Sequence, residues 1–207
     1  MSTCPWHPAR IPSVWCRMRK LILIKHAKPQ TAPDVPAHGW RLSEEGRRGA
    51  EALIPRLIPH VPDRFITSEE PKAVETGQII AQRLGKLVAS APGLHEHDRS
   101  NVPMLATREF ISLMALFFKE PGRLVLGRET AQAAAQRFER AVADVLMKYP
   151  ADNLALVTHG TVLALFAADR GAGDPYLLWR RMGLPSAVVF SLPDYRLVEM
   201  VESVQIG

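Results

Sequence analysis

The sequence predicts an α/β fold: a three-layer α/β/α arrangement around an open, mostly parallel sheet. Residues 21–24 (LILI) and 154–157 (LALV) are apolar at every position, a pattern typical of strands that are buried on both faces. Segments with helical periodicity separate these and other strand-like runs. Such an alternation favours parallel strands joined by helices that cover both faces of the sheet.

Capping residues mark the expected helices in the first half of the chain. Ser43 can cap a helix whose first turn is acidic, and Pro55 should end or kink that helix just after Leu53. Pro71 suits the first turn of a second helix, and Gly85 suits its end. The strands expected in this half are residues 21–24, 63–68 and 86–90, with the last of them at an edge of the sheet.

The second half of the chain continues the alternation. Residues 100–128 are expected to form an irregular segment around one apolar helix, and they could serve as a lid. The remaining expected elements are helices at 129–148, from 161 onward and at 175–181, and strands at 153–158, 186–192 and 196–201.

Composition favours one domain and a small anionic ligand. With 207 residues, of which 47% are hydrophobic, the chain can bury one sizeable core. The formal net charge is +5, but basic residues are interleaved with acids and form no aromatic-basic stripe, so nucleic-acid binding is not expected. No segment approaches the roughly eighteen consecutive apolar residues of a membrane span, so no membrane association is expected either.

The segment 1–17 is expected to be a loosely structured extension of a domain that spans 18–207. It contains both cysteines, Cys4 and Cys16, and no continuous apolar run typical of a secretion signal. Together with His7 these cysteines could bind a metal, but a fourth ligand is missing and the spacing fits no common zinc frame. Since the body of the protein has no cysteine, a reducing compartment, the cytoplasm, is expected.

Two buried strands end in histidine. LILI runs into Lys25 and His26, and LALV runs into Thr158 and His159. Because adjacent parallel strands end at the same edge of a sheet, both imidazoles are expected in one crevice. A neutral imidazole can attack phosphorus and form a phosphohistidine. Lys25, and Lys72 at the start of a helix, could stabilise the phosphoryl oxygens.

Five motifs, in order along the chain, resemble those of the histidine phosphatase superfamily, which includes the phosphoglycerate mutases. LILIKHA (21–27) resembles its Arg-His-Gly signature, and RLSEEGRRGAEAL (41–53) and ITSEEPKAVETGQIIAQRLG (66–85) resemble its two helical motifs. GLHEHD (93–98) is similar to its acid loop, and LALVTHGTVL (154–163) to its second His-Gly. The resemblance implies a phosphoglycerate mutase-like fold.

The same resemblance implies roles for individual residues. His26 would be the nucleophile, His159 would hold the transferring phosphoryl group, and Glu96 would be the proton donor, provided its pKa is raised. Asp98 is the rival donor. No cofactor is implied. A metal bound by residues 95–98 (HEHD) is the less favoured alternative, because neighbouring side chains seldom all point the same way.

The chain departs from the family pattern at Lys25 and Lys72, where the family has arginine. Lysine offers a point charge instead of a planar fork for two phosphate oxygens. Three interpretations stay open: a working site in a divergent branch, a site for another substrate, or a decayed enzyme that only binds phosphate. In GRET (127–130), which resembles a family turn, Arg128 and Glu129 could face the site, or Thr130 could simply cap a helix.

The predicted function is therefore metal-independent hydrolysis of a phosphomonoester or a phosphoamide through phospho-His26. The expected partner is a phosphorylated small molecule or a phosphoprotein. The alternatives are a catalytically silent phosphate-binding or adaptor protein and, less favoured, a phosphomutase, which would have to protect its phosphoenzyme from water.

Overall fold

The computed structural model describes residues 18–32 and 34–206 of the chain. The helices in this part are α1 (Glu44–Leu57), α2 (Pro71–Leu84), α3 (Thr107–Lys119), α4 (Ala131–Lys148), α5 (Gly160–Asp169) and α6 (Pro175–Arg181), with short 3-10 helices at η1 (Ala37–Gly39) and η2 (Ile58–His60). The strands are β1 (Lys20–Lys25), β2 (Arg64–Thr67), β3 (Leu87–Ser90), β4 (Leu154–Thr158), β5 (Ser186–Ser191) and β6 (Arg196–Val201).

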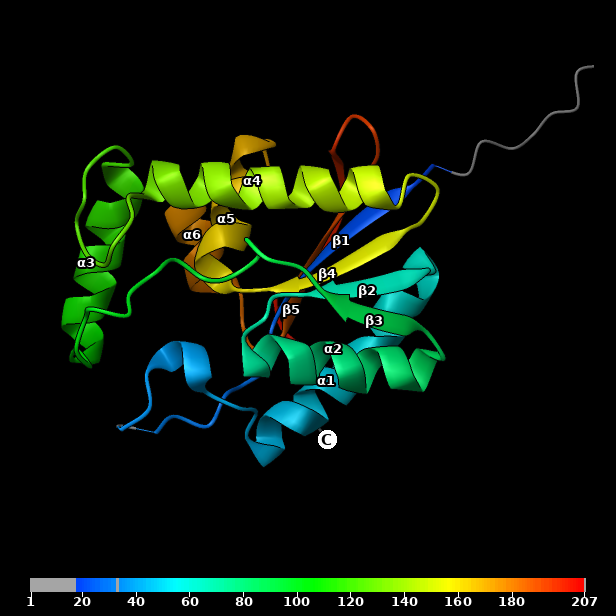
Figure 1. Ribbon diagram of the computed structural model, residues 1–207, viewed down its shortest axis with the longest axis horizontal. Helices are drawn as coiled ribbons and strands as arrows, with labels where there is room; N and C mark the ends of the chain where they lie inside the picture. The colour runs from blue at the N-terminus through cyan, green and yellow to red at the C-terminus, as the bar shows by residue number, and fades with distance from the viewer. Residues whose placement is uncertain (1–17, 33, 207) are drawn as a thin grey trace, which may run out of the picture.

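The described strands form one six-stranded sheet in the order β3-β2-β4-β1-β5-β6 (Figure 1). The first four strands in that order pair in parallel, while β5 and β6 are antiparallel to their neighbours. The predicted open and mostly parallel sheet is confirmed. The third strand along the chain, β3, lies at an edge as expected.

Two hydrophobic cores lie on the opposite faces of the sheet. Along β1, Leu21 and Leu23 belong to the core that includes α4 and α5, whereas Ile22 and Ile24 belong to the core that includes α1 and α2. Figure 1 shows these helix pairs on opposite sides of the strands. All four β1 side chains are fully buried, which accounts for the unbroken apolar run.

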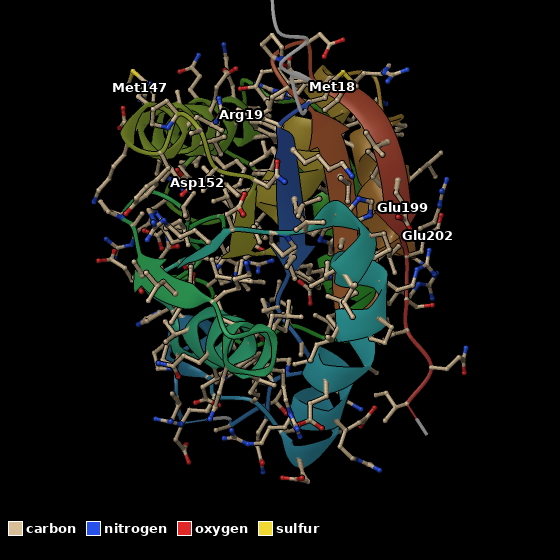
Figure 2. The ribbon with its side chains drawn as sticks, turned by 90° about the vertical axis from the view of Figure 1, so that its right-hand side faces the viewer. Met18, Arg19, Met147, Asp152, Glu199 and Glu202 are labelled. Atoms are coloured by element: carbon tan, nitrogen blue, oxygen red, sulfur yellow. The ribbon has the colours of Figure 1, made fainter. Side chains whose placement is uncertain are left out.

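Contacts at the start of the strands align β1 with β4. Just before β1, Arg19 Nε donates to the carbonyl oxygen of Asp152 at 3.3 Å, and both residues lie near the same end of the sheet (Figure 2). The parallel pairing then places Leu21 opposite Leu154 and Lys25 opposite Thr158. The residues that follow these two strands therefore emerge side by side.

The predicted helix caps are present. Ser43 Oγ accepts from the Gly46 N–H at 3.0 Å, and Thr130 Oγ1 accepts from the Ala133 N–H at 3.1 Å. Gly85 ends α2 with a φ of 63°, in the left-handed region that glycine adopts readily. Thr130 is thus the cap of α4, the simpler of the two expectations for GRET.

Of the two expectations for Pro55, an end of the helix just after Leu53 is wrong, because α1 continues through Pro55 to Leu57. A proline inside a helix removes one backbone hydrogen bond. Leu57, however, is fully buried in the core beneath the sheet, and burial of a leucine side chain stabilises by about 2 kcal/mol. That burial offsets the loss.

The predicted extension at 1–17 lies outside the described residues. Within the part of the chain that the structure describes, no helix has the length and apolar character needed to cross a bilayer.

Candidate active site

The structure brings His26 and His159 together where β1 and β4 end. Their ring centroids are 5.1 Å apart and the ring planes cross at 61°. The backbone N–H of His26 donates to the carbonyl oxygen of Thr158 at 2.9 Å, so the pairing of the two strands extends to the first histidine. The two imidazoles therefore lie side by side at the carboxyl ends of the strands, as the strand-end argument predicts.

The imidazole of His26 is held in one neutral form. Its Nδ1 lies 2.7 Å from the carbonyl oxygen of Ala27, which can only accept, so Nδ1 carries the proton. Burial lowers the pKa of His26 to about 3, and the positive charge of Lys72 acts in the same direction. At neutral pH, Nε2 is therefore an unprotonated nitrogen with a free electron pair, the form that a nucleophile requires.

His159 is completely buried, and its Nε2 lies 2.9 Å from Ser68 Oγ. Burial, followed by the neighbouring His26, holds its pKa well below the ordinary value. Its Nδ1 is buried and makes no hydrogen bond with the residues that the structure describes. A ligand atom could satisfy that nitrogen.

Lys25 lies beside the histidines, and its ammonium group makes one hydrogen bond with the protein. Nζ donates to the carbonyl oxygen of Met182 at 2.7 Å. Burial lowers the pKa of Lys25 to about 8, although the negative charge of Glu96 opposes the shift. Because an ammonium group has three N–H donors, others stay available for a ligand.

Lys72, at the start of α2, is almost completely buried. Nζ donates to the carbonyl oxygen of Ala37 at 2.7 Å and forms an ion pair with Glu70. The other Glu70 carboxylate oxygen, Oε1, lies 3.4 Å from His159 Nε2. Sequence reasoning misses this carboxylate. The available signal is an acid two residues before the expected phosphate-binding lysine, in the loop that follows a buried strand.

Glu96 lies in the acid loop, and its carboxylate accepts two backbone N–H groups. Oε1 accepts from His97 at 2.8 Å, and Oε2 accepts from Thr161, at the start of α5, at 3.2 Å. Burial raises the pKa of Glu96, but the charge of Arg99 and these two hydrogen bonds outweigh it, and the pKa is lowered. The raised pKa that a proton donor needs is thus not produced by the described residues alone.

Asp98 has a different environment. Its carboxylate accepts hydrogen bonds from Ser100, which lower its pKa together with a smaller contribution from Arg128. Glu96, in contrast, acts on the pKa of both Lys25 and His26. The geometry therefore favours Glu96 over Asp98 for a role at the histidines.

Arg137 on α4 holds the acid loop, a role that sequence reasoning misses. Its Nη1 donates to the carbonyl oxygens of Gly93 and His95 at 2.8 and 2.9 Å, and its Nη2 donates to that of Glu96 at 3.2 Å. The same guanidinium pairs with Glu129. Glu129 therefore supports the acid loop instead of facing the histidines, and the side chain of Arg128 is exposed.

The HEHD segment does not gather its side chains around one point. The imidazole of His97 packs on Phe117, with ring centroids 4.4 Å apart, and its Nε2 lies 3.0 Å from the Glu129 carbonyl oxygen. Across residues 18–32 and 34–206, no group of three or more histidine, cysteine, aspartate or glutamate side chains has a geometry that could hold a metal ion.

Solved structures resemble this fold over most of its length. A mycobacterial glucosyl-3-phosphoglycerate phosphatase in complex with inorganic phosphate is 20% identical, with a TM-score of 0.72 over 91% of this chain and 100% of that one. An Entamoeba histolytica phosphoserine phosphatase variant in complex with phosphoserine is 15% identical, with a TM-score of 0.72 over 89% and 97%. The alpha-ribazole phosphatase of Shigella flexneri is 22% identical, with a TM-score of 0.65 over 91% and 98%.

At such identities the structural likeness shows the fold, and the family follows from the sequence profile. No curated protein matches the chain by sequence. The profile of the histidine phosphatase superfamily (branch 1), however, matches residues 21–195. Since this match covers most of the chain, the protein belongs to branch 1 of the histidine phosphatase superfamily.

Proposed function

We propose that this protein is a phosphatase that hydrolyses a phosphomonoester or a phosphoamide through a phosphohistidine on His26, without a metal ion. The observation that carries the proposal is the fixed neutral form of His26, whose Nδ1–H is bonded to Ala27 while its pKa is lowered to about 3. A nucleophilic nitrogen thus exists at any pH near neutrality.

In the first step, His26 Nε2 attacks the phosphorus atom of the substrate. A nitrogen–phosphorus bond forms, the bond from phosphorus to the leaving oxygen or nitrogen breaks, and the leaving atom keeps the electron pair and takes up a proton. Lys25, Lys72 and His159 surround this centre and would stabilise the charge on the phosphoryl oxygens.

Glu96 is the proposed source of that proton. Its pKa is lowered in the protein without substrate, where burial opposes Arg99 and two backbone N–H groups. A bound phosphoryl group brings negative charge close to the carboxylate, and a nearby like charge raises the pKa of an acid. Glu96 would therefore take up its proton as the substrate binds and donate it to the leaving group.

In the second step, water attacks the phosphorus atom of phospho-His26 and gives its proton to the Glu96 carboxylate. The nitrogen–phosphorus bond breaks, which regenerates neutral His26 and releases inorganic phosphate. The same carboxylate thus acts first as an acid and then as a base.

The names of the structural relatives support a phosphorylated small molecule as the substrate. They refer to glucosyl-3-phosphoglycerate, phosphoserine and alpha-ribazole. We propose residues 100–128 as the lid that selects among such compounds. Phe110 on α3 lies against Trp179 on α6, with ring centroids 5.8 Å apart, and could form an apolar wall for the part of the substrate beyond its phosphate.

Hydrolysis of an aryl phosphate in the presence of EDTA tests the proposal. The wild type should release phosphate, and His26→Ala should lose at least about 10³-fold in kcat. His38→Ala is a matched control because His38 is exposed, and it should keep full activity. Activity that survives His26→Ala would contradict the mechanism.

One observation favours the silent phosphate-binding alternative: the ammonium groups of both lysines are already bonded to protein acceptors. If the wild type is inert and Lys25→Arg,Lys72→Arg gains turnover, that alternative is correct. A silent protein should still be stabilised against heat by phosphate.

A further inference from the structure

Glu70 occupies the donors that a bound phosphate would need. We define the phosphate cradle as His26, His159, Lys25 and Lys72. Glu70 forms an ion pair with Lys72, and its Oε1 lies 3.4 Å from His159 Nε2. The same oxygen accepts the backbone N–H of Glu96 at 3.0 Å.

This carboxylate is fixed inside the protein and does not lie at its rim. The side chain of Glu70 is only 10% exposed, and the residue's own N–H donates to Ser68 Oγ at 3.3 Å. Ser68 in turn bonds His159 Nε2 at 2.9 Å. A phosphoryl group held by Lys72 and His159 must therefore bind next to a negative charge that cannot move into water.

The charges around the phosphate cradle nearly balance. Lys25 and Lys72 are positive, and Arg99 acts on His159 and Glu96 from the acid loop. Glu70 and Glu96 are negative. In the protein without ligand, these two carboxylates therefore offset most of the positive charge of the three cations.

The imidazoles around Glu70 add no charge near neutral pH. Burial is the largest cause that lowers the pKa of His26, of His159 and of His95, whose ring lies in the acid loop. Lys25, with a pKa lowered by burial to about 8, loses its charge only at higher pH. Near neutral pH the ligand's own second ionisation, which lies at about 6 for phosphate esters, is therefore the main change of charge at the site.

We propose that Glu70 makes this site selective for a singly ionised phosphoryl group, whose remaining O–H donates a hydrogen bond to the Glu70 carboxylate. The inference rests on the proposed function only in taking phosphate as the ligand of the phosphate cradle. It concerns binding and does not require turnover.

The physical reason is the acceptor-only nature of a carboxylate. An ionised carboxylate has no proton to give, so it needs a donor from the ligand. A singly ionised phosphate has one, and an O–H group bonded to a carboxylate makes a short and strong hydrogen bond. A dianion has none, and its oxygen would face the carboxylate oxygen in a buried site where repulsion is poorly screened.

Sulfate provides the matching probe, because it resembles phosphate in shape but carries no proton at neutral pH. Binding of inorganic phosphate and of sulfate can be measured by calorimetry at about pH 6. The proteins to compare are the wild type, Glu70→Gln and Glu69→Gln. Glu69 is the adjacent residue and is exposed, so Glu69→Gln changes the net charge equally without touching the phosphate cradle.

The wild type and Glu69→Gln should bind phosphate at least about tenfold more tightly than sulfate, since a site built around a ligand proton rejects the analogue that lacks it. In Glu70→Gln the preference should fall to within about threefold, because the amide can donate to a dianion. Sulfate binding as tight as phosphate in the wild type, or an unchanged preference in Glu70→Gln, would overturn the inference.

If Glu70→Gln does not fold, a pH series on the wild type tests the same inference. The affinity for inorganic phosphate, relative to that for sulfate, should fall as the pH rises through the second ionisation of inorganic phosphate, which lies close to neutral pH, because sulfate has no proton to lose there. A relative phosphate affinity that rises over this range would overturn the inference. If the wild type prefers phosphate over sulfate but does not hydrolyse an aryl phosphate, only the proposed catalysis is contradicted. If the wild type binds neither ion, both the proposed function and this inference are contradicted.

Discussion

Gly160 and Lys25 lie so close that a methyl group on the Gly160 Cα would stand 3.0 Å from Lys25 Cε. The lysine side chain is not free to move away, because its Nζ donates to the Met182 carbonyl oxygen. The glycine after His159 therefore has a steric cause: it leaves room for the side chain of Lys25, the last residue of β1. The second His-Gly and the first Lys-His of the sequence are parts of one packed unit.

Gly160→Ala should displace the ammonium group of Lys25 and lower kcat/KM for an aryl phosphate by about tenfold. The melting temperature should change little, because alanine favours the first turn of α5. Steady-state kinetics and thermal unfolding check this. Gly122→Ala is the control, since a Cβ there meets no atom closer than 3.7 Å; equal kinetics in the two variants would contradict the steric argument.

Arg137→Met should loosen the acid loop. The variant removes hydrogen bonds to three backbone carbonyl oxygens and the ion pair with Glu129, and the free energy of unfolding should drop by about 3 kcal/mol. Because Glu96 is then held less firmly, kcat should fall more than KM rises, and the pH at which kcat is half-maximal should shift.

Arg140→Met is the matched control for this prediction, because Arg140 is exposed on the same helix. Denaturant unfolding and a pH profile of kcat measure the two effects separately. If Arg137→Met loses stability but keeps the wild-type pH profile of kcat, Arg137 does not position Glu96.

The sequence predicts the framework of the fold because its signals are local. An unbroken apolar run such as LILI needs only its own residues to indicate a strand buried on both faces, and parallel pairing then brings His26 and His159 together. Pro55 shows the limit of local signals: the burial of Leu57, on which the continuation of α1 depends, is a property of the assembled core.

The site could be predicted only in part, because several roles depend on contacts between distant residues. The direction of the Glu96 pKa depends partly on the N–H of Thr161, and the acid loop is held by Arg137 from another helix. The place of Glu70 among the residues of the proposed phosphate cradle likewise requires β2 and β4 to be neighbours. No spacing within one motif encodes such contacts.

The stability of the protein should fall as the pH drops below about 6.5. His26 stays neutral in the folded state down to about pH 3 because of burial and Lys72, whereas in the unfolded chain it takes up a proton near its ordinary pKa of about 6.5. The unfolded state then binds more protons, so acid favours unfolding by up to about 1.4 kcal/mol per pH unit for this one group.

Denaturant titrations between about pH 5 and pH 6.5 check this prediction, because the carboxylates whose pKa values are lowered titrate at lower pH. His26→Gln should reduce the slope of the unfolding free energy against pH by up to about 1.4 kcal/mol per pH unit, which is the contribution of one bound proton. His38→Gln, at an exposed position, should leave the slope as in the wild type. An unchanged slope in His26→Gln would contradict a neutral, buried His26.

The alkaline limit of activity should be set by Lys25. Burial lowers its pKa to about 8, so the cation that would stabilise the phosphoryl oxygens is present below that pH and is lost above it. The value of kcat/KM for an aryl phosphate should therefore decline above about pH 8. In Lys25→Arg the guanidinium keeps its charge at every accessible pH, and the decline should disappear even if the maximal rate is lower. Lys28→Arg, a change at an exposed lysine, should retain the wild-type profile, and a decline above pH 8 that persists in Lys25→Arg would assign the alkaline limit to another group.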